Sequence, residues 1–204
     1  MSEFTAFFQL GFGHIVTAGA LDHILFLAVL AVVYRARDWR EALWVISAFT
    51  VGHSVTLALA VTGALRLSEP VVEFLIPLTI VAAAIENLVT RDRSHTPRAR
   101  RYRPLLAGVF GLVHGAGFAG YLQSLFVERI AVPLVGFNVG IEVGQILVLL
   151  AIGAALTVVD AGLGRAQRVY LVPRAMPVLR FRIVGLSVMI GLVAAVWAVE
   201  RRPW

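Results

Sequence analysis

The sequence AVPLVGFNVGIEVGQILVLLAIGAALTVV, residues 131–159, decides the fold class of this chain. It contains one acidic and no basic side chain, and a helix needs only about 20 apolar residues to cross the hydrocarbon core of a bilayer. Asn138, Glu142 and Gln145 are spaced at i, i+4 and i+7, so they share one face of a helix. The segment therefore predicts a transmembrane helix with one polar stripe, which should face other protein and not lipid.

Five further apolar runs extend this prediction to the whole chain. We expect helices at about Leu21–Tyr34, Glu41–Leu65, Pro70–Thr90, Leu105–Leu125 and Phe181–Val199. Ahead of them, Phe4–Ala20 is apolar but interrupted by glycines, which predicts a short re-entrant or interfacial helix, or a seventh spanning helix. With 59% hydrophobic residues and a mean hydropathy of +0.86, the 204 residues predict an all-α polytopic membrane helical bundle that forms a single domain.

Glycines in two of these runs follow the four-residue spacing that lets helix backbones approach closely in lipid. They are Gly111 and Gly115 in one run, and Gly136, Gly140 and Gly144 in the other. We expect tight helix packing there, which would bring polar groups on neighbouring helices within metal-ligand distance. By contrast, Gly162, Gly164, Pro173 and Pro177 predict an irregular loop after Val159.

All eighteen basic residues are arginines, and they fall almost entirely between the apolar runs. Arginine-rich segments at residues 35–40, 91–103 and 160–180 alternate with segments that carry only Arg66 or Arg129. The positive-inside rule places the three rich segments in the cytoplasm and both termini outside. The net charge of +6 therefore reflects topology and contact with the lipid bilayer, not nucleic acid, and the expected location is the inner membrane of a bacterium.

Seven ionisable side chains lie inside the apolar runs, where each costs at least about 2.5–3.5 kcal/mol. They are His14, Asp22, His23, His53, Glu86, His114 and Glu142. So many such groups, from separate helices, predict a divalent-metal site in the core of the bundle, and Asn138 completes the eight predicted metal ligands.

Single members of this set have simpler interpretations. His53 alone could form an interhelical hydrogen bond. Glu86 has no basic neighbour on its own helix before Arg91, and a buried acid without a cation becomes protonated. His95 lies in an arginine-rich segment and is expected to be a solvated surface residue.

The chain has no cysteine, so metal ligands must be imidazole, carboxylate, amide or carbonyl groups. Such donors suit a divalent transition metal such as nickel, cobalt, zinc, manganese or iron, and the affinity order alone does not choose among them. Eight groups exceed the ligand number of one ion. Some of them would therefore orient other ligands, or there are two sites.

Five sequence blocks, the first of them in two parts, resemble the HupE/UreJ family, membrane proteins associated with hydrogenase and urease accessory systems. They are GFGHI at 11–15, LDHILF at 21–26, FTVGHSVTL at 49–57, IEN at 85–87, FGLVHGAGFA at 110–119 and GFNVGIEVGQ at 136–145. The resemblance implies a nickel or cobalt permease, with Asp22, His23, His114 and His14 as matching motif residues. Seven residues separate His14 from Asp22, whereas the nickel-permease members of the family have five there.

Three hypotheses follow from these observations. In the first, the chain is a permease for a divalent transition-metal ion such as nickel or cobalt, with no catalytic residue. In the second, it is an intramembrane metal-dependent enzyme, for example a zinc-type hydrolase that activates a water molecule. In the third, it is an accessory membrane subunit without metal. A polar track to both membrane faces would favour transport, and a compact site open to one side would favour an enzyme.

Overall fold

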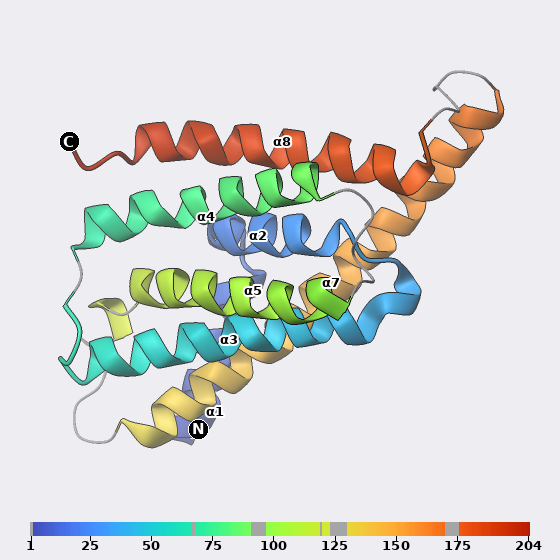
Figure 1. Ribbon diagram of the computed structural model, residues 1–204. Helices are drawn as coiled ribbons and strands as arrows, with labels where there is room; N and C mark the ends of the chain where they lie inside the picture. The colour runs from blue at the N-terminus through green and yellow to red at the C-terminus, as the bar shows by residue number, and fades with distance from the viewer. Residues whose placement is uncertain (1, 67, 91–96, 119, 123–129, 170–175) are drawn as a thin grey trace.

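The computed structural model is helical throughout the part of the chain that it describes, residues 2–66, 68–90, 97–118, 120–122, 130–169 and 176–204 (Figure 1). Two short 3-10 helices accompany the α-helices. The bounds are α1 Glu3–Val16, η1 Ala18–Ala20, α2 Leu21–Ala31, η2 Ala36–Asp38, α3 Trp39–Val61, α4 Glu69–Val89, α5 Pro97–Gly117, α7 Ala131–Arg168 and α8 Val178–Glu200.

Four helical segments are long and apolar enough to cross a membrane, namely α3 with the preceding η2, α4, α7 and α8. α1 and α2 together meet the same criterion as a pair bent by 66°, which raises the number to five. This composition indicates an integral membrane protein. The prediction of six long transmembrane helices is recovered only in part, because α5 begins with a run of arginines, the last of them Arg103, and does not meet the criterion.

The N-terminal segment differs from its glycine-based prediction. α1 runs without interruption through Gly11 and Gly13, and the chain breaks at Thr17, which has extended backbone angles. A glycine costs a helix only about 1 kcal/mol, which tertiary packing can offset. The following helix, α2, ends at Ala31 and not at Tyr34.

The prediction of an irregular loop directly after Val159 is wrong. α7 continues as a helix through Gly162 and Gly164 to Arg168. The flanking alanine, leucine and arginine residues are strong helix formers, and adding residues to an existing helix is much easier than starting one. Pro177 caps the start of α8, while Pro173 lies outside the described residues.

The other predicted boundaries are close to the observed ones. α3, α4 and α8 each agree with their predicted segments within a few residues. α5 begins at Pro97, ahead of the predicted Leu105, and ends at Gly117. The predicted end at Leu125 and the solvated position of His95 fall outside the part of the chain that the structure describes.

Two pairs of helices run parallel in close contact, α3 with α5 and α1 with α7. A Cβ atom added to Gly111 or Gly115 would collide with the carbonyl oxygen of Phe49 or His53. On α7, a Cβ on Gly140 would collide with the Phe8 carbonyl, and one on Gly144 would lie 3.1 Å from Cβ of Ile15. The predicted close packing at the two glycine rows is confirmed.

The third close pair, α4 and α8, runs antiparallel, with Ala84 against Gly191 and Asn87 against Ser187. The core consists of two apolar clusters. One contains Phe26 and Phe49, and the other contains Ile15, Leu57 and Phe137. Four of the predicted histidines lie where these clusters meet, as the ring contacts described next show.

Candidate metal centre

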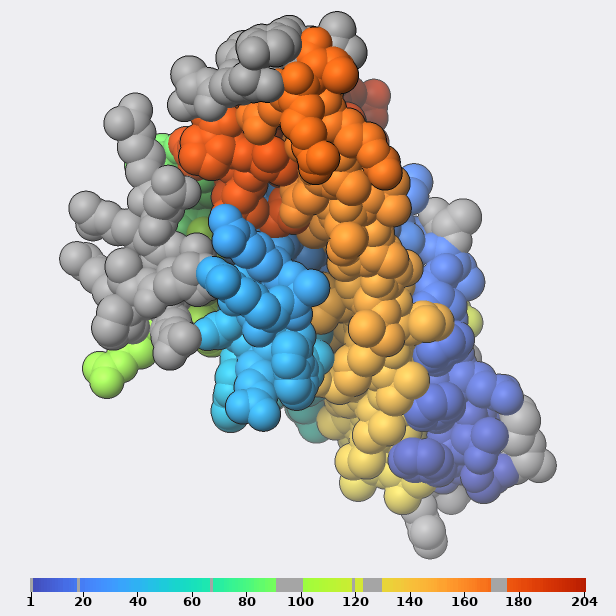
Figure 2. All heavy atoms as spheres, turned by 90° about the vertical axis from the view of Figure 1, so that its right-hand side faces the viewer, coloured from blue at the N-terminus to red at the C-terminus, as the bar shows by residue number. Residues whose placement is uncertain are grey.

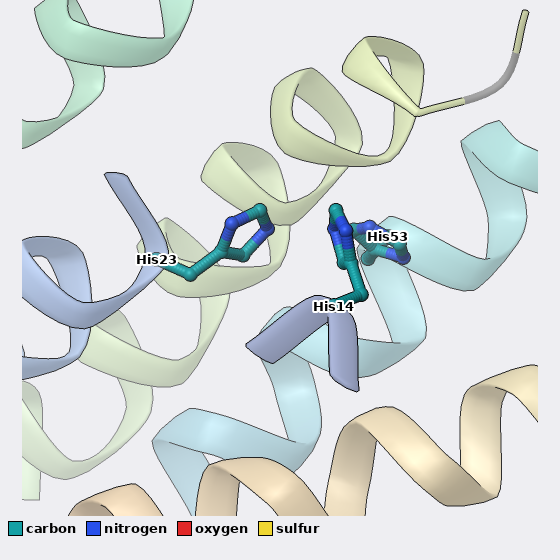
Figure 3. A group of neighbouring side chains, drawn as sticks. All are labelled: His14, His23 and His53. Atoms are coloured by element: carbon teal, nitrogen blue, oxygen red, sulfur yellow. The ribbon is translucent and has the colours of Figure 1, made fainter. Parts of the chain in front are cut away.

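Three histidines converge inside the bundle, each from a different helix (Figure 3). His14 lies in the last turn of α1, His23 in the first turn of α2 and His53 in the middle of α3. One ring nitrogen from each can be chosen so that all three lie within 4.8 Å of one another. His53 is fully buried, His23 is buried and His14 is half-buried. We call these three residues the histidine triad.

The break between α1 and α2 makes this convergence possible. His14 and His23 are nine positions apart, which in one straight helix would separate them by about 13.5 Å along the axis. The chain instead turns by 66° between the two helices, and the two ring centroids lie 4.8 Å apart. A helix interruption at membrane depth is tolerated where other protein buries it.

Four of the six ring nitrogens of the triad are buried without a hydrogen-bond partner among the residues that the structure describes. The unpartnered buried atoms are Nε2 of His14, Nε2 of His23, and both Nδ1 and Nε2 of His53. Leaving one buried polar atom without a hydrogen bond costs about 1–3 kcal/mol, and few buried polar atoms in native proteins lack a partner. A metal ion bound between the three rings would satisfy such nitrogens, because it accepts the lone pair of an unprotonated imidazole nitrogen.

His114 adds a fourth imidazole beside the triad. Its ring centroid lies 5.2 Å from that of His23, and its Nε2 lies 2.9 Å from Oγ1 of Thr79. The Thr79 hydroxyl donates its proton to the carbonyl of Ile76 at 2.7 Å, so it accepts from His114 Nε2–H. Nδ1 of His114 is then the unprotonated nitrogen, and it is buried with no partner in the described structure.

Aromatic rings surround these imidazoles. Phe118 lies 4.1 Å from His14 between ring centroids, Phe26 lies 4.8 Å from His114, and Phe49 contacts three of the four histidines. An apolar wall excludes water and leaves the imidazoles without solvent partners, which strengthens any interaction with a cation.

The carboxylates that the sequence predicts as ligands have other partners. Asp22, next to His23, accepts a hydrogen bond from Arg201 at 2.9 Å, and its Oδ1 is buried without a partner among the described residues. Glu86 pairs with Arg103 at 3.0 Å and accepts a bond from Thr90. Glu86 therefore has a cation beside it, although its own helix supplies none, because Arg103 comes from α5.

The polar stripe of α7 is used largely in contacts with α3. Glu142 accepts a hydrogen bond from Ser47 at 2.7 Å, and Gln145 accepts one from Thr50 at 2.7 Å. The amide nitrogen of Asn138 donates to the carbonyl of Leu134, while its Oδ1 is buried and unpartnered in the described structure. Of the eight predicted ligands, the structure brings His14, His23 and His53 together with His114 beside them, and Asp22 is the only acid adjacent in sequence to a triad member.

The protein-family model described as HupE / UreJ protein matches residues 1–201 of the chain. The chain belongs to the HupE/UreJ family. Searches of the curated proteins and of the solved structures found no match.

In this HupE/UreJ protein, sequence reasoning missed two buried arginines and one threonine. Arg103 and Arg182 are almost fully buried, and each neutralises an acid from another helix, Glu86 of α4 and Asp160 of α7 respectively. Arg182 lies inside a predicted transmembrane helix, and a charged residue at such a position could have indicated a buried ion pair. Thr79 gave no signal, because a lone threonine in an apolar helix is common.

Three or four imidazoles in a dry, rigid setting can bind a divalent transition-metal ion. The HupE/UreJ chain offers them as neutral nitrogen donors, with one carboxylate, Asp22, close by in sequence. The triad itself contains no carboxylate that could compensate the charge of an ion. Such a site binds an ion less tightly than one with carboxylate ligands in direct contact.

Proposed function

We propose that this HupE/UreJ protein passes a divalent transition-metal ion through the membrane, and that His14, His23 and His53 bind the ion on its way. The observation that carries the proposal is the convergence of three imidazoles, each with at least one buried ring nitrogen that has no partner within the described structure. The family resemblance narrows the substrate to an ion of the nickel or cobalt kind. Nitrogen donors without thiolate are consistent with either metal.

The broken helix pair supports transport. Many transporters bind substrate near the bilayer midplane at discontinuous helices, whose irregular backbone lines the site. Here, two of the three triad members flank such a break, at the end of α1 and the start of α2. Conduction also requires that binding be weak enough for release, which an uncharged ligand set favours.

The remaining predicted ligands take different roles in this proposal. His114 is a fourth ligand, reached by a small shift of its Nδ1 toward the ion. Asp22 attracts the cation at the approach to His23. Glu142 lies at the neighbouring α3–α7 contact, and Asn138 lies one turn before it on α7; there they would hold the ion transiently. Glu86 stabilises the bundle through Arg103.

We also propose six membrane spans. α1 and α2 form one broken span, and α3, α4, α5, α7 and α8 form the other five. This count places the arginine-rich segments 35–40, 91–103 and 160–180 on one side, in the cytoplasm of a bacterium, and both termini on the other.

The test is metal flux into liposomes that contain the purified protein and an enclosed metal-sensitive dye. His53→Ala removes a fully buried triad ligand, and it should reduce nickel or cobalt influx at least tenfold. His95→Ala makes the same substitution in an arginine-rich segment and is the matched control, expected to transport like the wild type. Equal influx through both variants would exclude the triad from the path.

One observation favours a second candidate, a metal-dependent enzyme. Three histidines with an open fourth position are also a ligand set of catalytic zinc. An enzyme should retain about one metal ion per chain through purification and show no flux in liposomes, whereas a permease should release its ion. Elemental analysis of the same preparation separates the two. If neither bound metal nor flux is found, the accessory-subunit hypothesis is the one that is left.

A further inference from the structure

A cavity of about 490 Å³ lies at the arginine-rich end of the bundle. It is bounded by the end of α2, by η2 and the start of α3, and by the second half of α7 (Figure 2). None of the four clustered histidines lines it. Its size is typical of small-molecule sites, which range from about 300 to 1,000 Å³.

Two guanidinium groups and one carboxylate line this cavity. Arg182 donates to the carbonyls of Val32 and Tyr34 and forms an ion pair with Asp160, so both of these charges are compensated. Arg35 lines the same cavity, and its exposed guanidinium forms no ion pair with another described residue. The cavity therefore retains one uncompensated positive charge, which favours an anionic ligand.

Apart from Thr157, the rest of the lining is mostly apolar, and part of it is exposed on the outer surface of α7. Leu149, Leu150 and Ala154 of α7 line it, and Leu150 is two-thirds exposed on a helix whose apolar surface is mostly uncovered. Trp39 stands in the lining beside Arg35 and is half exposed. Tryptophan and arginine together mark the level of the lipid headgroups. A ligand that matches this lining has a negative head and a long apolar body.

We propose that the cavity binds one bilayer phospholipid with an anionic headgroup, such as phosphatidylglycerol. Its phosphate would lie at Arg35, with the acyl chains along Leu149, Leu150 and Ala154. Basic pockets between helices at the cytoplasmic side commonly bind such headgroups. The inference does not depend on the proposed metal transport, because it rests on other residues.

Native mass spectrometry of the purified protein, titrated with phosphatidylglycerol or phosphatidylcholine, tests the headgroup contact. Arg35→Gln should reduce the preference for phosphatidylglycerol at least fivefold, and Arg35→Lys should retain most of it. Arg37→Gln is the matched control, because Arg37 lies on the same turn, pairs with Asp38 and does not line the cavity. Equal preference in Arg35→Gln and Arg37→Gln overturns the proposal.

A second pair of variants tests the apolar part. Gly153 lines the cavity and has open space where a Cβ would lie, so Gly153→Leu should fill it and lower the retention of both lipids. Gly185→Leu on α8 also enters open space, away from the cavity, and should bind lipid normally. Unchanged retention in Gly153→Leu contradicts the proposal. So does full competition by glycerol phosphate without acyl chains, which would make the site one for a soluble phosphate.

Discussion

At the scale of single residues, Thr79 determines which nitrogen of His114 is available as a ligand. Its hydroxyl holds Nε2–H of His114, so a Thr79→Val variant leaves that proton without a partner and Nδ1 poorly fixed. Partners of this kind typically change metal affinity 10- to 100-fold when removed. We expect nickel binding, measured by competition with a metal-sensitive indicator, to weaken by at least about tenfold in Thr79→Val.

The control for this prediction is Thr62→Val. Thr62 is exposed at the end of α3, where its hydroxyl donates to carbonyls of its own helix and to no other group in the described part of the chain. The variant should bind metal as the wild type does. If Thr79→Val binds equally well while His53→Ala does not, His114 lies outside the ligand set and the triad binds the ion alone.

Breaking the Asp22–Arg201 pair should strengthen metal binding, whereas Thr79→Val should weaken it. Arg201 occupies Oδ2 of Asp22, and so it competes with an arriving cation for the carboxylate. Because both side chains are partly exposed, the pair contributes at most about 1 kcal/mol, which corresponds to roughly fivefold in affinity. Arg201→Gln should therefore bind nickel about two- to fivefold more tightly than the wild type in the same indicator assay.

Arg202→Gln removes an exposed neighbouring charge and should leave the affinity unchanged. Weaker binding in Arg201→Gln would show that the ion pair positions α2 and does not restrain Asp22.

At the scale of helices, the site depends on the close approach of α3 and α5. A Cβ at Gly115 would collide with the backbone carbonyl of His53, and backbone cannot rotate away as a side chain can. Gly115→Ala should therefore push the two helices apart, lower the free energy of unfolding by about 1–3 kcal/mol and weaken metal binding. Thermal unfolding in detergent, with and without nickel, measures both effects.

Gly162→Ala is the matched control. Gly162 lies within α7 with open space around it, and alanine is the better helix former by about 1 kcal/mol. This variant should be as stable as the wild type or slightly more stable. If Gly115→Ala unfolds at the same temperature as Gly162→Ala, α3 and α5 have room to move apart without loss of stability.

Hydrophobic runs predicted most helices, because burial in lipid leaves few alternatives to a helix. The break at Thr17 was not predicted, because tertiary packing keeps α1 helical through the glycines that the prediction took as its interruption. The continuation of α7 past Val159 was not predicted, because its glycines lie among strong helix formers at the end of an existing helix. The sequence predicted the histidines of the site. It did not predict that the acids would pair with arginines elsewhere instead of joining the histidines. Glu86 and Asp22 find their arginines 17 and 179 positions further along the chain, and spacing alone does not reveal such partners.

At the scale of the whole molecule, the proposed six spans place both termini on one side of the membrane and the arginine-rich turns on the other. Because the natural chain has no cysteine, single-cysteine variants give a clean test. A membrane-impermeant maleimide added to intact cells should label Ser2→Cys and Arg202→Cys. It should label Arg37→Cys, in the exposed η2 turn, only after the membrane is permeabilised.

The pattern distinguishes between span counts, since it depends on whether α5 crosses and whether α1 and α2 together cross once. An odd number of spans would place Ser2 and Arg202 on opposite sides. If Arg37→Cys is labelled in intact cells and both termini are protected, the number of spans is even but the orientation is the reverse of the proposed one. In that case a cation that enters from outside would reach the arginine-rich end first, which is the unfavourable direction for a positive ion.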